Sequence, residues 1–439
     1  MKRIVLPLIL IFLGLSCKRP ASEQVENTPP DTHIFIEGVV DTVPAYQIIH
    51  WYGNDPDGYV VGYFYHWDND TPVFTTKNVD TFTLSVPDSD SIGMHVLYVS
   101  AVDNENAEDP TPATLNIPVK NSPPTISFQH NTLPPDTTLP YVTFYVETHD
   151  VDGDESVIGF YYKTDYDTMW VFQSIDTDYV TFENVPEGVH VFSFMAVDRS
   201  HATSDVISDT IYIKPKVGRI LVIDDSPDGD ADNTYGAFFS DNYQGNYTLW
   251  DVGKFLPYSF YDIDGIINKL GFDVIFWYTG TEKNVVNPLK KSIETYIDDG
   301  KSLFLIGPSV LDSVYNPDDT LSSKGFMNKY LGVKNVKKWN TLMMDGGIVD
   351  LYSQDTLHLQ FPSFKMEFIE PNDTMDAVPV FKAFGTNISD SVSCVGVAFP
   401  SGSPSVYFVP LELHKFNQDG NLQDVLKRII DSLLSRGRR

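Results

Sequence analysis

Cysteine and basic residues are both scarce in this sequence of 439 residues. The chain has 2 cysteines, so a disulfide framework cannot hold it together and its stability must come from packed cores. Lys and Arg number 30 against 60 Asp and Glu, which gives a formal net charge of −30. So acidic a chain disfavours nucleic acid as a partner, because phosphates require a basic surface.

Long hydrophobic runs are also missing. The apolar run at the N-terminus, Ile4 to Ser16, is shorter than the ~20 residues that a membrane-spanning helix needs. It follows Lys2 and Arg3, and this order is typical of a secretory signal peptide. The sequence therefore predicts a signal peptide over residues 1–16 and export from the cytoplasm.

The end of that run, Leu13-Gly-Leu-Ser-Cys17, resembles the lipobox of bacterial lipoproteins, although Gly14 stands where that family usually has leucine. The resemblance implies that Cys17 is lipidated and anchors the chain to a membrane of the cell envelope. We expect the outer membrane, with the protein facing either the periplasm or the surface. The polar, proline-rich residues 17–30 then form a tether. Cys394 is left as a buried, inert thiol on a strand.

The chain repeats itself at a spacing of about 95 residues, which indicates tandem domains. We place them at residues 31–119 and 120–215. Four segments recur, namely Asn27-Thr-Pro-Pro30 as Asn121-Ser-Pro-Pro124, Asp55-Pro-Asp-Gly58 as Asp150-Val-Asp-Gly153, Gly93–Val96 as Gly188–Val191, and Ala101–Asp103 as Ala196–Asp198.

Each repeat has aromatic and β-branched runs separated by Asp, Gly, Pro and Asn, as Val60–Trp67 and Val191–Val197 illustrate. About seven short strands in ~95 residues favour an all-β, immunoglobulin-like sandwich. The stretch Trp51 to Tyr63 resembles the fibronectin type III-like modules of bacterial surface proteins. Both repeats are therefore expected to be such modules.

From residue 217 to 439 the pattern changes to strands alternating with helices, which predicts an α/β domain with a doubly wound parallel sheet. A hairpin is expected near residues 392–409. Strands are predicted at 217–223, 247–252, 272–278 and 302–306, and helices at 262–270, 288–298, 326–331 and 422–434.

This half resembles the class I glutamine amidotransferase-like, flavodoxin-like domains, through stretches such as "RILVIDD", "FDVIFWYTG" and "VYFVPLELHKF". In the active members a cysteine follows the strand that corresponds to Leu303–Ile306. Here the chain reads Ile306-Gly-Pro-Ser-Val310, and Pro410–His414 has the family's His, Pro and Glu in the wrong order. The resemblance therefore implies the fold without the activity.

The stretch Ile220 to Asn233 is predicted to be a buried strand that runs into an acidic loop ending at residue 233. We predict a ligand loop made of Asp224, Asp225 and Ser309. Asp228, Asp230 and Asp232 form a weak candidate metal site, where carboxylates would bind Ca²⁺. An EF-hand is excluded, because the twelfth residue counted from Asp228 is a phenylalanine.

We expect a membrane-anchored, non-enzymatic binding or scaffolding lipoprotein whose sandwiches are spacers, with an envelope protein or a glycan as partner and no cofactor unless Ca²⁺ binds. Two alternatives stay open. One is a hydrolase with Ser309 as nucleophile, His414 as base and Glu412 or Asp225 orienting that base. The other is a surface protein that binds calcium or glycan.

Overall fold

The structure is a computed structural model that describes residues 26–36, 42–86, 92–281, 284–314, 325–343, 345–360, 364–385, 388 and 393–436. The predicted signal peptide, Cys17 and residues 17–25 of the predicted tether lie outside the described residues. The chain divides into two compact units, Met1–Ser122 with Val151–Ser156, and Pro123–Asp150 with Val157–Arg439. Among the described residues, no helix is both long enough and apolar enough to cross a membrane.

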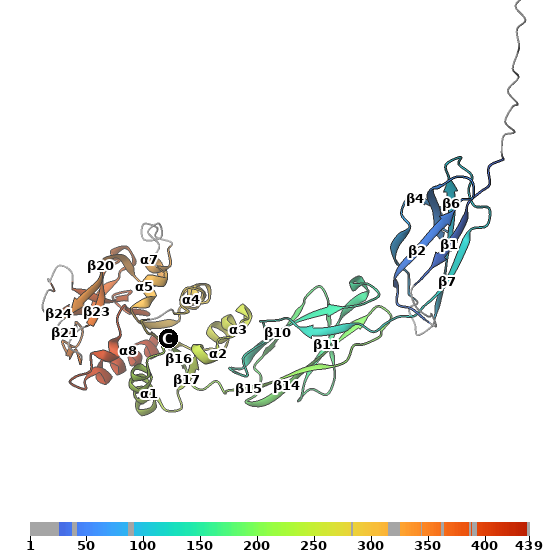
Figure 1. The fold of residues 1–439 in the computed structure, drawn as a ribbon. Helices are drawn as coiled ribbons and strands as arrows, with labels where there is room; N and C mark the ends of the chain where they lie inside the picture. Colours follow the sequence, from blue (N-terminus) through green and yellow to red (C-terminus); the bar gives the residue numbers. More distant parts are fainter. Residues whose placement is uncertain are drawn as a thin grey trace, which may run out of the picture. The chain divides into compact units, whose positions relative to one another are not determined.

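The first repeat folds into two facing antiparallel sheets, with strand orders β1-β2-β5 and β4-β3-β6-β7. Alternate residues point inward, and Trp51 lies at the centre of the core with 1 % of its surface exposed. The strands are β1 (Asp31–Phe35), β2 (Tyr46–Asn54), β3 (Val60–Trp67), β4 (Val73–Thr75), β5 (Val79–Thr83), β6 (Gly93–Asp103) and β7 (Ala113–Val119) (Figure 1).

The second repeat has a similar arrangement, with strand orders β13-β10-β8 and β12-β11-β14-β15-β9, in which β9 pairs with β15 in parallel and the other pairs are antiparallel. Phenylalanines from both sheets, Phe144 and Phe194 among them, fill its core. The prediction of two all-β sandwiches is therefore confirmed. The elements are β8 (Thr125–Phe128), β9 (Thr137–Thr138), β10 (Tyr141–His149), η1 (Asp154–Ser156), β11 (Val157–Thr164), β12 (Val171–Ser174), β13 (Tyr179–Glu183), β14 (Gly188–Asp198) and β15 (Ile207–Ile213).

The remainder is built on a nine-stranded sheet with the order β17-β16-β18-β19-β26-β25-β24-β21-β22. The first five strands of that order are mutually parallel: β16 (Ile220–Asp225), β17 (Tyr247–Asp251), β18 (Val274–Thr279), β19 (Ser302–Ile306) and β26 (Val406–Val409). Antiparallel pairing then continues through β25 (Cys394–Phe399), β24 (Val378–Phe384), β21 (Gly347–Asp350) and β22 (Thr356–His358).

Four strands of this sheet are thus antiparallel, where the sequence predicted a parallel sheet with one hairpin near residues 392–409. Their connections explain this, since a short turn joins only antiparallel neighbours. The hairpin predicted near residues 392–409 is confirmed as β25 and β26. A separate antiparallel pair is formed by β20 (Val333–Met343) and β23 (Phe364–Pro371).

Helices cover both faces of the parallel strands. Alternate strand residues enter two different cores, with Val222 packed beside α1 and α8 and Leu221 packed beside α3, η2 and α4. The helical elements are α1 (Gly229–Tyr243), α2 (Val252–Phe255), α3 (Phe260–Asp264), the π-helical turn η2 (Gly265–Lys269), α4 (Lys290–Asp298), α5 (Ser309–Val314), α7 (Phe326–Tyr330), η3 (Asp373–Met375), η5 (Leu413–Lys415) and α8 (Leu422–Arg436).

The second sandwich packs against α3 and η2 through the outer face of β10. The Thr143 hydroxyl donates a hydrogen bond of 2.6 Å to the Asp262 carboxylate. The Lys269 ammonium donates to the Tyr141 hydroxyl at 3.1 Å. Burial raises the pKa of Asp262 to about 7, although the bond from Thr143 opposes this.

Residue 265 has to be glycine for this packing. A Cβ atom at Gly265 would overlap the ring of Tyr141, which is 2 % exposed and has no room to move. The π-helical turn begins at this glycine. The absence of a side chain therefore sets how closely the helix approaches the strand.

We predict that Gly265→Ala destabilises the folded chain by about 1–3 kcal/mol, because the methyl group forces the Tyr141 ring out of its site. The free energy of unfolding in urea measures this. Gly236→Ala is the matched control, because no atom lies within 4 Å of the Cβ position at this glycine on α1. The control should gain roughly 0.5–1 kcal/mol. Equal effects of the two substitutions would contradict the packing constraint.

Candidate functional site

The candidate site lies at the carboxyl ends of the parallel strands. The chain passes from β16 to β17 on one side and later to β18 on the other side of β16, so the strand order reverses there. Ligands of open α/β sheets bind in the crevice that such a reversal leaves. Segments after β16, β18, β19 and β26 supply the side chains around this point.

The acidic segment after β16 is shorter than predicted. Helix α1 begins at Gly229, and Asp228 caps it by accepting a hydrogen bond of 3.0 Å from the Asp230 backbone N–H. Asp230 and Asp232 therefore lie in the first turn of a helix, and the prediction of a loop through residue 233 is wrong. The apolar residues of α1 at helical spacing, Ala231, Tyr235, Phe238 and Phe239, could have revealed it.

Asp224 lies on the α1 side of the sheet and near Asp232. Burial, and then the negative charge of Asp232, raise the pKa of Asp224 to about 6. The hydroxyl of Tyr278 donates to Asp232 at 3.3 Å. Two carboxylates and a phenol therefore share one side of the strand ends.

Asp225 points to the other side. Its carboxylate accepts hydrogen bonds from the Trp277 indole at 3.2 Å and from the Val285 backbone N–H at 2.9 Å. Burial raises its pKa to about 6, and these two bonds oppose the rise. The side chain thus ties the segment after β18 to the end of β16.

Asp228 meets two residues that follow β26. The His414 ring nitrogen Nε2 lies 3.2 Å from an Asp228 oxygen, and ligand atoms of Asp228, Glu412 and His414 all lie within 4.8 Å of one another. Glu412 and His414 are both buried. The Lys415 ammonium lies 2.8 Å from Glu412 and 3.8 Å from Asp228, so it partly neutralises the pair of carboxylates.

Burial lowers the pKa of His414, although the charges of Glu412 and Asp228 oppose this, so the ring is neutral at neutral pH. Burial alone would raise the pKa of Asp228. The bond from the Asp230 N–H, the charge of Lys415 and the hydrogen bond with the His414 ring instead hold it below its ordinary value. An ionised carboxylate beside a neutral imidazole suits either an internal hydrogen bond or a divalent metal ion.

Ser309 is held by three polar groups at the start of α5. Its hydroxyl donates to the Gly280 carbonyl at 2.6 Å and accepts from the Asn284 amide at 3.0 Å. The Thr279 hydroxyl lies 3.2 Å away. In the described part of the chain no hydrogen bond joins Ser309 to His414, so the residues of the hydrolase alternative are not brought together as a nucleophile and its base.

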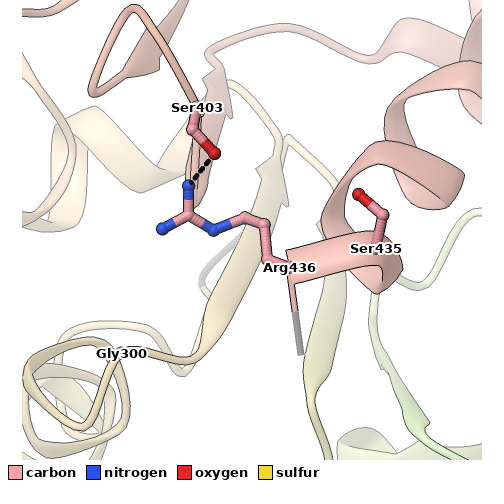
Figure 2. Close-up of a pocket in the computed structure, with 4 residues that line it drawn as sticks. All are labelled: Gly300, Ser403, Ser435 and Arg436. Atoms are coloured by element: carbon pink, nitrogen blue, oxygen red, sulfur yellow. Dashed lines mark hydrogen bonds between the residues drawn. The ribbon is translucent and has the colours of Figure 1, made fainter. Parts of the chain in front are cut away.

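Two other features lie elsewhere in this part of the chain. Cys394 is on β25, and burial raises the pKa of its thiol to about 11, so it stays protonated at neutral pH. A pocket of about 210 Å³ lies beside the amino ends of β19 and β26, where Arg436 donates to the Ser403 hydroxyl at 2.7 Å (Figure 2).

Comparison with known proteins finds similarity to β-sandwich modules. No family model and no curated protein matches the chain. The fibronectin(III)-like modules of Clostridium thermocellum CbhA align with 17% identity, over 42% of this chain and 95% of theirs, at a TM-score of 0.20. A two-domain fibronectin type III segment of chicken tenascin aligns with 14% identity, over 43% and 99%, at 0.23.

The PKD1 domain of Vibrio anguillarum Epp aligns with 17% identity, over 22% of this chain and 98% of that domain, at a TM-score of 0.17. Likenesses at these TM-scores tell nothing of what the chain does. Its two sandwiches are established by their own strand pairing.

We predict that Ser309→Ala lowers the free energy of unfolding by about 1–3 kcal/mol, because the buried Asn284 amide and the Gly280 carbonyl lose their partner. The exposed Ser435 on α8 is the control, and its substitution by alanine should stay within about 0.5 kcal/mol. The same proteins should not react with a fluorophosphonate probe. Labelling of the wild type that disappears in Ser309→Ala would show a nucleophile and contradict the structural role.

Proposed function

We propose that this protein is a lipid-anchored binding or scaffolding protein of the bacterial cell envelope, without enzymatic activity. The observation that supports the absence of enzymatic activity is that the Ser309 hydroxyl donates its hydrogen bond to the Gly280 carbonyl. A serine nucleophile requires a base positioned on its hydroxyl. His414 instead contacts Asp228.

In this proposal the C-terminal part is a doubly wound domain related to the class I glutamine amidotransferase-like, flavodoxin-like domains. The parallel strand order β17-β16-β18-β19-β26 supports it, since it corresponds to the order 2-1-3-4-5 of flavodoxin-like sheets. The chain after β19 reads Gly307-Pro308-Ser309, where active amidotransferases have a cysteine. The carboxyl ends of the parallel strands are then a place for binding, and the two sandwiches are spacers between this place and the membrane.

The first prediction of this proposal concerns the lipid anchor at Cys17. Cys17→Ser should move the protein from the membrane fraction to the soluble fraction and abolish incorporation of labelled palmitate, because each buried CH₂ of the acyl chains contributes ~0.8 kcal/mol to anchoring. Cys394→Ser is the matched control, since Cys394 is the other cysteine of the chain and should not alter either readout. Membrane association that survives Cys17→Ser would overturn the lipid anchor.

A second candidate function is the binding of a divalent metal ion by Asp228, Glu412 and His414. The 3.2 Å between His414 Nε2 and the Asp228 oxygen suits two ligands that each lie about 2.0–2.2 Å from one zinc ion. One imidazole and two carboxylates are a donor set for Zn²⁺ or Mn²⁺ rather than for Ca²⁺, which prefers oxygen ligands alone. Lys415 competes with the metal for both carboxylates.

Titration with Zn²⁺ followed by calorimetry tests this candidate. Zinc should bind with one equivalent, His414→Gln should weaken binding at least tenfold, and Lys415→Ala should strengthen it because a competing cation is removed. His190→Gln is the control, since His190 is also paired with an aspartate, Asp165, but lies in the second sandwich. Binding that is absent, or equally sensitive to both histidine substitutions, would rule the metal out.

A further inference from the structure

The two sandwiches carry the same strand in two different environments. β2 and β10 have nine residues each and occupy corresponding places in the repeat. They pair in the same register, because Tyr46 lies opposite Thr83 of β5 and Tyr141 lies opposite Glu183 of β13. The residues at the same positions of β2 and β10 can therefore be compared one by one.

Burial along the two strands agrees from the fifth residue to the ninth and differs at the first and the third. Tyr141 and Thr143 are 2 % and 0 % exposed, because α3 and η2 cover them. Tyr46 and Ile48, at the same two positions, are 52 % and 50 % exposed. The first sandwich thus leaves open the part of the sheet that is an interface in the second.

The open face is more apolar than the covered one. We call it the β2 face and define it by Phe35, Tyr46, Ile48, His50, Tyr52 and Thr81. Phe35 stacks on His50 with ring centroids 5.2 Å apart. None of the six carries a formal charge with histidine neutral, although the chain as a whole has a net charge of −30. Aromatic enrichment with depletion of charge is typical of the centre of a protein interface.

We propose that the β2 face binds a helical segment of a partner protein, in the way that the matching face of the second sandwich holds α3 and η2. This inference goes beyond the proposed function, because it gives the first sandwich a binding role of its own. A second copy of the chain is disfavoured as the occupant, since two molecules with a net charge of −30 repel each other.

The residues that differ between the β2 face and the covered face of β10 specify the chemistry of the partner. Thr143 of the covered face bonds to Asp262, whereas Ile48 at its place offers no hydrogen bond. A buried carboxylate opposite Ile48 would be unpaired, so the partner helix must have an apolar residue there. Glu183 lies 3.6 Å from Lys269, whereas Thr83 at its place has no charge. The partner helix therefore needs no lysine at the position that corresponds to Lys269.

Site-specific photo-cross-linking in intact cells that produce the full chain tests the proposal. Benzoylphenylalanine replaces Tyr46 in one variant and Phe74 in the control. Phe74 is also an exposed aromatic, 49 % accessible, but it lies on β4 of the other sheet. We expect an adduct with one protein from position 46 and not from position 74. Mass spectrometry of the cross-linked peptide should place it in a helix of that protein.

Two further variants separate binding from folding. Ile48→Lys should reduce the adduct from position 46 at least tenfold, because it brings an unpaired ammonium against an apolar helix. Ile48→Leu should keep the adduct, and both should melt within a few degrees of the parent. The proposal is overturned if position 46 yields no protein adduct, a glycan, another copy of the chain or a non-helical peptide. It is equally overturned if position 74 gives the same adduct or if folded Ile48→Lys keeps it.

Discussion

The second sandwich can lie as close as it does to α3 and η2 because residue 265 has no side chain. Without a Cβ at Gly265, the helix backbone approaches the ring of Tyr141 closely enough for Thr143 to reach Asp262. A carboxylate buried in this way costs free energy unless it is hydrogen-bonded or neutral. Asp262 accepts the hydrogen bond from Thr143, and burial raises its pKa to about 7, so it takes up a proton below that pH. One missing side chain therefore allows a polar contact that joins two structural classes into a single compact unit.

At the carboxyl ends of the parallel strands, polar groups are instead satisfied by partners within the chain. The Asp225 carboxylate accepts two hydrogen bonds, the Ser309 hydroxyl has three polar neighbours, and Asp228 caps α1 while it faces His414. Using such a group in a reaction costs free energy, because its hydrogen-bond partner would be left buried and unsatisfied. Sites for catalysis instead hold donors and bases aimed at the place of the substrate. This arrangement is the reason for our proposal that the protein has no enzymatic activity.

The sequence predicts elements with a strong local pattern and misses those without one. Continuous apolar runs located β16, β18 and β19, and the stripe of apolar residues located α8. Helix α1 was missed because its first turn, with Asp230 and Asp232, has the composition of a loop. The antiparallel strands β21 and β22 are only 4 and 3 residues long, too short for a period to show. The approach of His414 to Asp228 joins residues 186 positions apart, and nothing in a single sequence reports such a contact.

The duplicated modules show how a shared fold can acquire two surfaces. Their cores keep inward-facing apolar residues on β2 and β10, since these are needed in any sandwich. The residues on their outer faces do not have to be apolar for the sandwich to fold, so they can differ between the two modules. In the second module polar residues suit the carboxylate and ammonium of α3 and η2, whereas Ile48 in the first has no such group to match. Fully burying an isoleucine contributes about 1.5–3 kcal/mol, so covering its remaining half offers on the order of 1 kcal/mol. Covering Tyr46 adds a similar amount. Because Tyr46 and Ile48 lie side by side on the β2 face, one bound segment would cover both of them.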